Sequence, residues 1–364
     1  MCPAYLRARV AALRGRLKRW PADALLVTNP LDVRYLTGFV GDDSWALVSA
    51  ASNRVTLISD FRFQEQIARE APHAAVVIRK GPFSDVLVRI AHRSKIDRFA
   101  VQSASMTLAV RNALAAKLSA RRLVPVDDGL LQQRAVKDPI EVRLIGRALQ
   151  CQQEAYRRVL KELKPGQTER SVVARLEMHM RELGADGSSF PTIVAADANT
   201  SLPHALAGQT RIKKGGTILF DWGARCAGYC SDLTRVVAIG RMPSRVREIY
   251  RIVLDAQCAA IDAIGPGRAM CEVDAVARRW IDKAGYGDQF GHSLGHGIGL
   301  HVHEEPVVAS RSDGELKPGH VVTVEPGIYL PGVAGVRIED DVLVTPRGRR
   351  VLSDLPKDLE SAIV

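Results

Sequence analysis

Four histidines lie within one sixteen-residue stretch of the chain, residues 291–306, with the sequence GHSLGHGIGLHVHEEP. The stretch also holds four glycines and has neither helical nor strand periodicity. Glycine adopts backbone angles closed to other residues and lets the backbone approach a ligand closely. The segment is therefore a candidate binding or catalytic site, against the alternative of a polar loop with incidental histidines. These histidines are His292, His296, His301 and His303.

Four carboxylates end or interrupt apolar runs that are typical of strands. Asp221 follows TILF, and Asp232 lies eleven positions later in CSDLTR. Glu325 follows VVTV, and Glu339 interrupts GVRIEDDVLV. A carboxylate is costly to bury without a partner. One of them alone would more often be a turn residue, but the four together with a histidine from residues 291–306 indicate a cation between strands.

These residues form a hard, oxygen-rich ligand set that suits Mn²⁺, Fe²⁺ or Co²⁺ better than a structural Zn²⁺ site. Four carboxylates around one divalent ion would leave excess negative charge, whereas two divalent ions balance them. Two metals about 3.5–4 Å apart can share a water molecule and lower its pKa towards about 7. The set therefore predicts a dinuclear centre with a bridging hydroxide that attacks a carbonyl group. The candidate ligands are Asp221, Asp232, His296, Glu325 and Glu339.

An internal repeat places two of these carboxylates at equivalent positions. Residues 213–223 (KKGGTILFDWG) match residues 317–327 (KPGHVVTVEPG) at an offset of 104, which aligns Asp221 with Glu325. The helical stretches before them, which begin LKPGQ and IGPGR, match at an offset of 101. Two copies of one helix-then-strand unit indicate a duplicated domain and not a solenoid. Two halves that face each other would bring the two acids to a shared seam.

The first 130 residues alternate between apolar strand-like runs and helical stretches, which predicts an α/β domain. An opening basic helix precedes a buried strand, ALLVT, which a turn signal at Asn29 and Pro30 ends. The segment LLQQRAVKDP is interpreted as a linker. We therefore expect an N-terminal domain at residues 1–130, a linker at 131–139 and a second domain at 140–364.

The composition, with 46% hydrophobic and 25% charged residues in 364, is typical of a globular protein. No apolar run approaches the roughly 20 residues of a membrane helix. The basic start lacks the apolar core of a signal peptide and is expected to form an amphipathic helix. The six cysteines are scattered without a CxxC pair, which favours reduced thiols and a cytoplasmic location.

The net charge of +11 lies wholly in the N-terminal part of the chain. Residues 1–137 hold 22 Lys and Arg against 11 Asp and Glu, while residues 138–364 hold 29 of each. A basic domain raises the question of a polyanionic partner. Aromatic residues are few and no basic run exceeds two residues, so we favour a solvated arginine-rich surface and expect neither nucleic acid nor membrane as a partner.

These motifs resemble the metallopeptidase family of creatinase, prolidase and methionine aminopeptidase. FDWG, SDLTR, GHSLGHGIGLHVHEEP, TVEPGIY and GVRIEDDVLV follow in the family's order across residues 138–350. RYLTGF and SDFR, within residues 24–62, are similar to the N-terminal domain of the creatinase/prolidase branch. The resemblance covers nearly the whole chain and implies an α/β N-terminal domain followed by an α+β "pita-bread" catalytic domain with an internal pseudo-two-fold duplication.

The resemblance also implies a role for each candidate ligand. Asp221 would bind one metal, His296 and Glu325 would bind the other, and Asp232 and Glu339 would bridge the two. Glu325 would serve in addition as the general base for the metal-bound water. The metals are expected to be Mn²⁺, with Co²⁺, Fe²⁺ or Zn²⁺ as alternatives.

Further residues match family positions outside the ligand set. His204, His292 and His303 match histidines that contact the substrate and the transition state. Arg337, two residues before Glu339, matches an arginine that supports the ligands. His301 matches no such position and is expected to be a bystander.

Within the family, the complete ligand set argues against creatinase, which uses no metal, and against scaffold members that lack ligands. Methionine aminopeptidases lack an N-terminal domain of this kind. Some prolidases carry an arginine just after the HExP proline, where this chain has Val307. The resemblance therefore implies an Xaa-Pro aminopeptidase acting on peptides with proline at the second position, as a homodimer. An Xaa-Pro dipeptidase (prolidase) is the alternative, and a non-catalytic module that binds a polyanion is a distant one.

Overall fold

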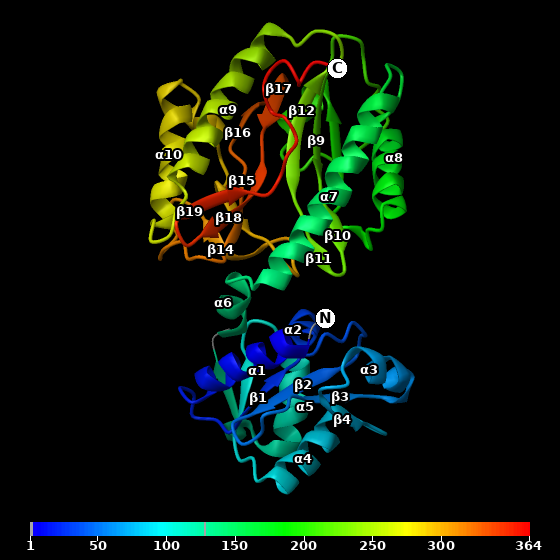
Figure 1. Cartoon of the computed structure of the whole chain (residues 1–364), viewed down its shortest axis with the longest axis vertical. Helices are drawn as coiled ribbons and strands as arrows, with labels where there is room; N and C mark the ends of the chain where they lie inside the picture. Colours follow the sequence, from blue (N-terminus) through cyan, green and yellow to red (C-terminus); the bar gives the residue numbers. More distant parts are fainter. Residues whose placement is uncertain (1–2, 127–128) are drawn as a thin grey trace. The chain divides into compact units, whose positions relative to one another are not determined.

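The computed structural model describes residues 3–126 and 129–364 and divides into two compact units, Met1–Arg134 and Ala135–Val364. Each unit has its own sheets and its own apolar core (Figure 1). No helix in the described ranges is long and apolar enough to cross a membrane. The five cysteines within these ranges are free thiols, and Cys2 lies outside them.

The N-terminal unit contains a six-stranded mixed sheet with the order β4-β3-β2-β1-β5-β6 and helices packed against it (Figure 1). Strand β1 pairs antiparallel with β2 and parallel with β5, so the α/β prediction for this region is confirmed. The strands are β1 (Ala24–Val27), β2 (Trp45–Ser49), β3 (Thr56–Ser59), β4 (Ala75–Ile78), β5 (Phe99–Gln102) and β6 (Leu123–Val126). The helices are α1 (Pro3–Leu17), α2 (Pro30–Thr37), α3 (Gln64–Glu70), α4 (Phe83–Ser94), α5 (Leu108–Leu118) and α6 (Gly129–Ala135).

Two helices of this part of the chain differ from the expectation. Asn29 and Pro30 do more than end a strand, because the Asn29 side chain accepts hydrogen bonds from the first N–H groups of α2 and Pro30 occupies its first position. Helix α6 covers much of the expected linker. The sequence LLQQRA in α6 consists of good helix formers, and Leu130 anchors the helix by burial.

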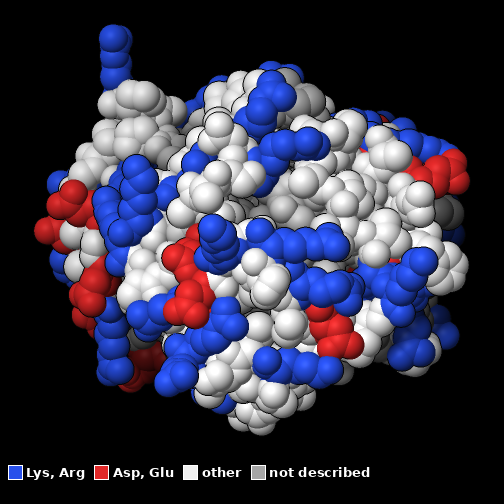
Figure 2. Space-filling view, turned by 90° about the horizontal axis from the view of Figure 1, so that it is seen from below, with Lys and Arg blue, Asp and Glu red and all other residues white. Residues whose placement is uncertain are grey.

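Basic side chains predominate on the face of the N-terminal unit that Figure 2 shows. The N-terminal unit also carries ion pairs between exposed side chains: Arg62 contacts Asp43, and Lys117 contacts Asp85. Exposed ion pairs of this kind contribute little to stability, which agrees with a solvated surface.

The second unit holds the two halves predicted by the repeat. Helices α7 and α8 lie on one side of its strands, and α9 and α10 lie on the other (Figure 1). The helices are α7 (Pro139–Glu162), α8 (Glu169–Glu182), α9 (Ser244–Ala263) and α10 (Met270–Lys283). The first-half strands are β7 (Gly187–Ser188), β8 (Ile193–Ala196), β9 (Thr217–Trp222), β10 (Ala224–Cys226), β11 (Tyr229–Cys230) and β12 (Leu233–Ala238). The second-half strands are β13 (Gly295–Gly297), β14 (Glu304–Val308), β15 (Val321–Val324), β16 (Gly327–Leu330), β17 (Ala334–Arg337), β18 (Asp340–Thr345) and β19 (Gly348–Val351).

The backbone repeats together with the sequence. Gly215 and Gly319, aligned by the repeat, have φ angles of 76° and 96°. Gly184 and Gly285, which follow the aligned helices α8 and α10, have φ angles of 94° and 84°. Side chains rarely adopt this left-handed region, so glycine is required at these turns. The predicted internal duplication is therefore confirmed, with sheet β12-β9-β8 in the first half and sheet β14-β13-β15-β18-β19 in the second.

Candidate metal centre

Each half presents two carboxylates across one antiparallel strand pair. In the first half, Asp221 lies in β9 opposite Thr234 of β12, and Asp232 directly precedes β12. In the second half, Glu325 directly follows β15 and Glu339 directly precedes β18, its antiparallel partner. All four carboxylates line one pocket, so the seam predicted from the repeat exists and both halves contribute to it.

His296 in β13 faces this carboxylate group. Its Nε2 lies 3.3 Å from Glu325 Oε1 and 3.7 Å from Asp232 Oδ2. Its Nδ1 lies 3.1 Å from the Gly297 carbonyl oxygen and donates to it, which turns Nε2 towards the carboxylates. The His296 N–H donates to Thr323 Oγ1 at 3.0 Å, and the Thr323 hydroxyl donates to Glu325 Oε1 at 3.1 Å. Hydrogen bonds from the backbone N–H and from the ring therefore fix the orientation of His296.

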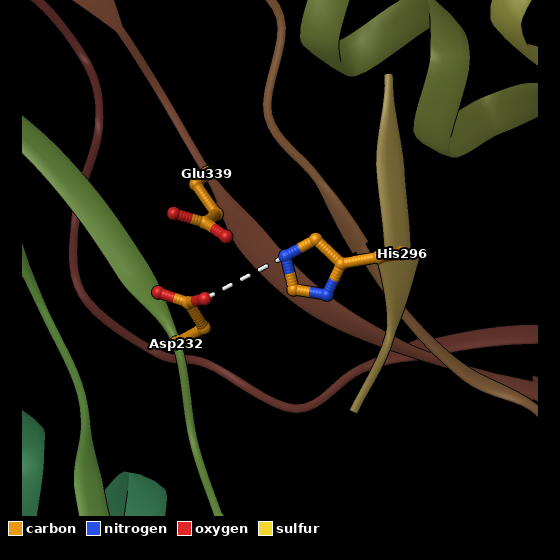
Figure 3. A group of neighbouring side chains, drawn as sticks. All are labelled: Asp232, His296 and Glu339. Carbon is orange, nitrogen blue, oxygen red and sulfur yellow. Dashed lines mark ion pairs between the residues drawn. The ribbon is translucent and has the colours of Figure 1, made fainter. Parts of the chain in front are cut away.

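Asp232, His296 and Glu339 each offer one atom within 4.8 Å of the others (Figure 3). Asp232 is 5% exposed and Glu339 is 1% exposed. One oxygen of each, Asp232 Oδ1 and Glu339 Oε1, is buried without a hydrogen-bond partner among the described residues. Buried polar atoms are nearly always paired. Two carboxylates that each keep an unpaired buried oxygen and lie next to one imidazole fit a site for divalent cations.

The charge of the site points to the same conclusion. Burial raises the pKa of Asp232 and of Glu339 well above the usual range, and the neighbouring carboxylates raise it further. Burial also tends to raise the pKa of Glu325, but the hydrogen bond and positive charge of His296 outweigh it and hold that pKa at about 2. Carboxylates this close repel one another in a medium of low dielectric. Divalent cations between them would relieve the repulsion.

Arg337 links the ligands of the two halves through all three guanidinium nitrogens. Its Nη2 pairs with Asp221, its Nη1 donates to the Tyr329 hydroxyl at 2.7 Å, and its Nε donates to Thr234 Oγ1 at 3.0 Å. The Thr234 hydroxyl donates in turn to Glu339 Oε2 at 2.7 Å. Arg337 is 3% exposed, so this buried network holds the carboxylates in fixed orientations.

The pocket has a volume of about 930 Å³. It contains every residue that the sequence assigned to the site: Asp221, Asp232, His296, Glu325, Glu339, His204, His292, His303 and Arg337. His301 is not in its lining, and its Nδ1 lies 2.6 Å from the His303 carbonyl oxygen.

The pocket histidines differ in how they are held. The His303 ring lies edge-on to His296 with a centroid distance of 4.4 Å. Burial and the neighbouring His296 lower the pKa of His303, so its ring is neutral at pH 7. His292 contacts the Ser293 carbonyl oxygen through Nδ1 at 2.8 Å and the Tyr329 hydroxyl through Nε2 at 3.1 Å. His204 is exposed at the pocket wall.

Four residues at the site escaped the sequence analysis: Thr234, Thr323, Tyr329 and Asp341. Asp341 is fully buried and accepts a hydrogen bond from the Asp232 N–H at 3.3 Å. Burial raises the pKa of Asp341 to about 8. The available signal was proximity, because each of the four lies within four residues of a candidate ligand along the chain.

Comparison with known proteins identifies both units. Residues 143–346 match the model of metallopeptidase family M24, and residues 9–136 match the creatinase/prolidase N-terminal domain. An uncharacterized peptidase of Bacillus subtilis, YqhT, is 39% identical over 351 residues, which is 96% of this chain and 99% of the relative.

Solved structures extend the likeness to the whole chain. An Xaa-Pro dipeptidase from Bacillus anthracis is 37% identical, with a TM-score of 0.94 over 99% of this chain and 100% of the other. An X-Pro aminopeptidase from Thermotoga maritima is also 37% identical, with a TM-score of 0.90 over 97% and 100% of the two chains. A prolidase from Pyrococcus horikoshii is 32% identical, with a TM-score of 0.90 over 97% and 99%.

Proposed function

The chain belongs to metallopeptidase family M24 and carries the creatinase/prolidase N-terminal domain, and from this membership we propose that it hydrolyses the Xaa-Pro bond at the amino terminus of peptides. Peptidases of this family depend on two metal ions. Asp221, Asp232, His296, Glu325 and Glu339 would hold two divalent ions, with Mn²⁺ the first candidate. Such ions lower the pKa of a coordinated water and polarise the scissile carbonyl.

The chain's own residues supply the proton transfer and the stabilisation of charge. Glu325 is ionised at neutral pH, because His296 outweighs the effect of burial on its pKa. It can therefore accept a proton at a carboxylate oxygen and later donate it to the leaving proline nitrogen. His303 faces the same pocket with a neutral ring. Its N–H can donate to the oxygen on which negative charge develops as the peptide bond is attacked.

One observation favours an aminopeptidase over a dipeptidase. Among the described residues, Arg337 is the only lysine or arginine that lines the pocket, and all its nitrogens are engaged. Val307 lies opposite His296 in the β13–β14 pair and therefore on the same face as that ligand. A dipeptide's free carboxylate would sit near four acidic groups without a matched cation. A longer peptide places a neutral amide there instead.

The experiment compares kcat/KM for Ala-Pro and Ala-Pro-Ala under one Mn²⁺ concentration. We expect the tripeptide to be the better substrate by at least tenfold. An unpaired charge in a partly dry site costs on the order of several kcal/mol, which is enough to lower kcat/KM by that factor. Preference for the dipeptide would overturn the aminopeptidase assignment.

The Xaa-Pro dipeptidase is the second candidate, favoured by the likeness to the Bacillus anthracis protein of that name. A polyanion-binding module without catalysis is a more distant one. Metal analysis after purification without chelator separates it from the peptidases. About two ions per chain support a peptidase, whereas no metal together with salt-sensitive binding to a polyanion supports the module.

A further inference from the structure

A buried ion pair joins the start of the catalytic unit to the segment that carries His303. Lys137 Nζ lies 2.7 Å from Glu304 Oε1, and the two side chains are 0% and 3% exposed. Lys137 lies three residues beyond Arg134, the last residue of the N-terminal unit. Breaking a buried pair on one side leaves an uncompensated charge, so its placement constrains both chain segments strongly.

Both ends of the pair are fixed by further contacts. The Lys137 N–H donates to the Gly319 carbonyl at 2.8 Å, and Nζ donates to the Ala135 carbonyl at 3.2 Å. Gly299 is the first residue of the segment 299–304 that leads to Glu304, and there is no space for a side chain at this position. A Cβ there would lie 2.3 Å from the Glu304 carboxylate and 3.1 Å from Lys137 Cε. The backbone of residues 299–304 therefore closes tightly around the pair.

The chain itself connects the pair to the pocket. Glu304, the first residue of β14, is buried, and His303 directly before it lines the pocket. The pairing of β14 with β13 is irregular between Glu304 and Val307, so the position of His303 depends on where residues 299–304 are held and not on a regular strand. A shift of Glu304 would therefore move His303 with it.

We propose that Lys137 is a positioning residue, which through Glu304 holds residues 299–304 so that His303 faces the candidate metal centre. Lys137 itself touches neither the candidate ligands nor the pocket. The expected effect of the pair on kcat rests on the proposed function of His303. Its expected effect on the order of residues 299–304 does not. A displacement of about 1 Å in a reacting group is enough to lower a rate about 100-fold.

The test uses the double variant Lys137→Met/Glu304→Gln, which removes both charges at nearly constant shape and so leaves no lone buried charge. A matched control, Arg134→Met/Asp32→Asn, removes a pair of similar burial in the N-terminal unit, where the side chains are 3% and 1% exposed. Four quantities are measured well below the unfolding temperature: bound Mn²⁺, kcat and KM on Ala-Pro-Ala, and hydrogen exchange of peptides covering residues 299–305 and 290–295.

We expect the double variant to keep its Mn²⁺ and its KM within about threefold while kcat falls about 10–100-fold. Exchange should accelerate in residues 299–305 and stay unchanged in 290–295. The control should keep kcat within about twofold.

Unchanged exchange and unchanged kcat would overturn the proposal, as would faster exchange with full kcat. Loss of Mn²⁺ in parallel with kcat, or an equal loss in the control, would assign the pair to general stability and overturn it as well. If the wild-type protein cleaves no Xaa-Pro peptide, the proposed function fails, and the exchange measurement still decides whether Lys137 positions the segment.

Discussion

The two halves of the second unit have the same backbone fold but contribute different numbers of residues to the candidate metal centre. Each half supplies one acid in or directly after the first strand of an antiparallel pair and one directly before its partner strand. These acids are Asp221 and Asp232 in the first half and Glu325 and Glu339 in the second. The candidate imidazole ligand comes from the second half, as do the buried arginine and two of the three pocket histidines outside the candidate ligand set. These second-half residues are His292, His296, His303 and Arg337. The carboxylates are thus placed symmetrically by the duplication, while most of the other candidate site residues come from one half.

The two halves differ in their number of pocket histidines because the segment after α8 and its counterpart after α10 are built differently. After α8 the first half runs through short strands to the exposed His204. After α10 the second half enters the glycine-rich residues 291–306, whose backbone passes close to other strands. A Cβ at Gly295 would lie 2.0 Å from the Thr323 carbonyl oxygen, so only glycine allows this approach. Close packing therefore brings three histidines of one segment to the pocket.

Removing a carboxylate of either half tests the symmetric part and has the largest expected effect. Asp232→Ala should lose at least one metal and reduce turnover to background, and Glu339→Ala should do the same. Asp255→Ala, on the exposed face of α9, is the control and should keep both ions. Metal content and kcat/KM are measured on the same preparations. Two tightly bound metals with a near-normal rate in Asp232→Ala would rule out its role as a ligand.

In the metal-free protein, we expect a substitution of Asp232 to raise the stability of the fold. Burial and neighbouring carboxylates disfavour the charged form of Asp232, as its raised pKa indicates. The unfolded chain carries this carboxyl group ionised at neutral pH, so a raised pKa in the folded chain means that Asp232 destabilises the fold when no cation is present. Metal-free Asp232→Asn should unfold at a higher temperature than the metal-free wild type. An unchanged or lower unfolding temperature would mean that the repulsion is relieved by other means.

The asymmetric part is tested by His303→Ala in the second half. A donor aimed at a developing oxyanion typically contributes about 10²–10³ in rate. We expect kcat to fall by that factor with metal content intact, because His303 lines the pocket but stands outside the ligand set. His92→Ala, at an exposed position of helix α4 in the N-terminal unit, is the control. Loss of metal in parallel with kcat would reassign His303 as a ligand.

The sequence indicated the four carboxylates because they end or interrupt apolar runs, and the internal repeat marked Asp221 and Glu325 in addition. The pocket histidines were indicated by the histidine-rich residues 291–306 and by the family resemblance. The hydrogen-bonding network around them could not be predicted, since it depends on tertiary register. Thr234 and Arg337 are 103 residues apart, yet their side chains meet at 3.0 Å. Helix α2 was missed for another reason, because Asn29 and Pro30 serve equally well in a turn and at a helix start.

The turn before each of the aligned strands β9 and β15 differs between the two halves, and this difference predicts a pH dependence of the stability. The repeat aligns Gly216 of the first half with His320 of the second, which is 4% exposed. Burial and the charges of Lys137 and Lys317 lower the pKa of His320 to about 4. The Lys317 N–H donates to its Nδ1 at 3.2 Å, a bond that protonation at that nitrogen would break.

The unfolded chain would bind a proton at this position near pH 6.5, so the stability from neutral His320 is present above pH 6.5 and is lost as pH falls from 6.5 to 4. By pH 5 the loss is about 2 kcal/mol. Unfolding by urea at pH 7.5 and pH 5 should show a smaller decrease for His320→Gln than for the wild type. Equal decreases in the two proteins would show that His320 does not titrate in this range.

The smallest expected effect concerns Val307, a second-half residue that faces the pocket opposite His296. Val307→Arg should raise kcat/KM for Ala-Pro by up to about tenfold, because a guanidinium there can pair with the dipeptide carboxylate and weaken its repulsion by the acidic centre. Ala-Pro-Ala carries its carboxylate one residue further out and should gain less. Val307→Gln has similar polarity without the charge, and it should leave the ratio of the two substrates near the wild-type value. If the wild-type protein already prefers Ala-Pro, a cation other than residue 307 binds the carboxylate, and the second half then carries the specificity of a dipeptidase.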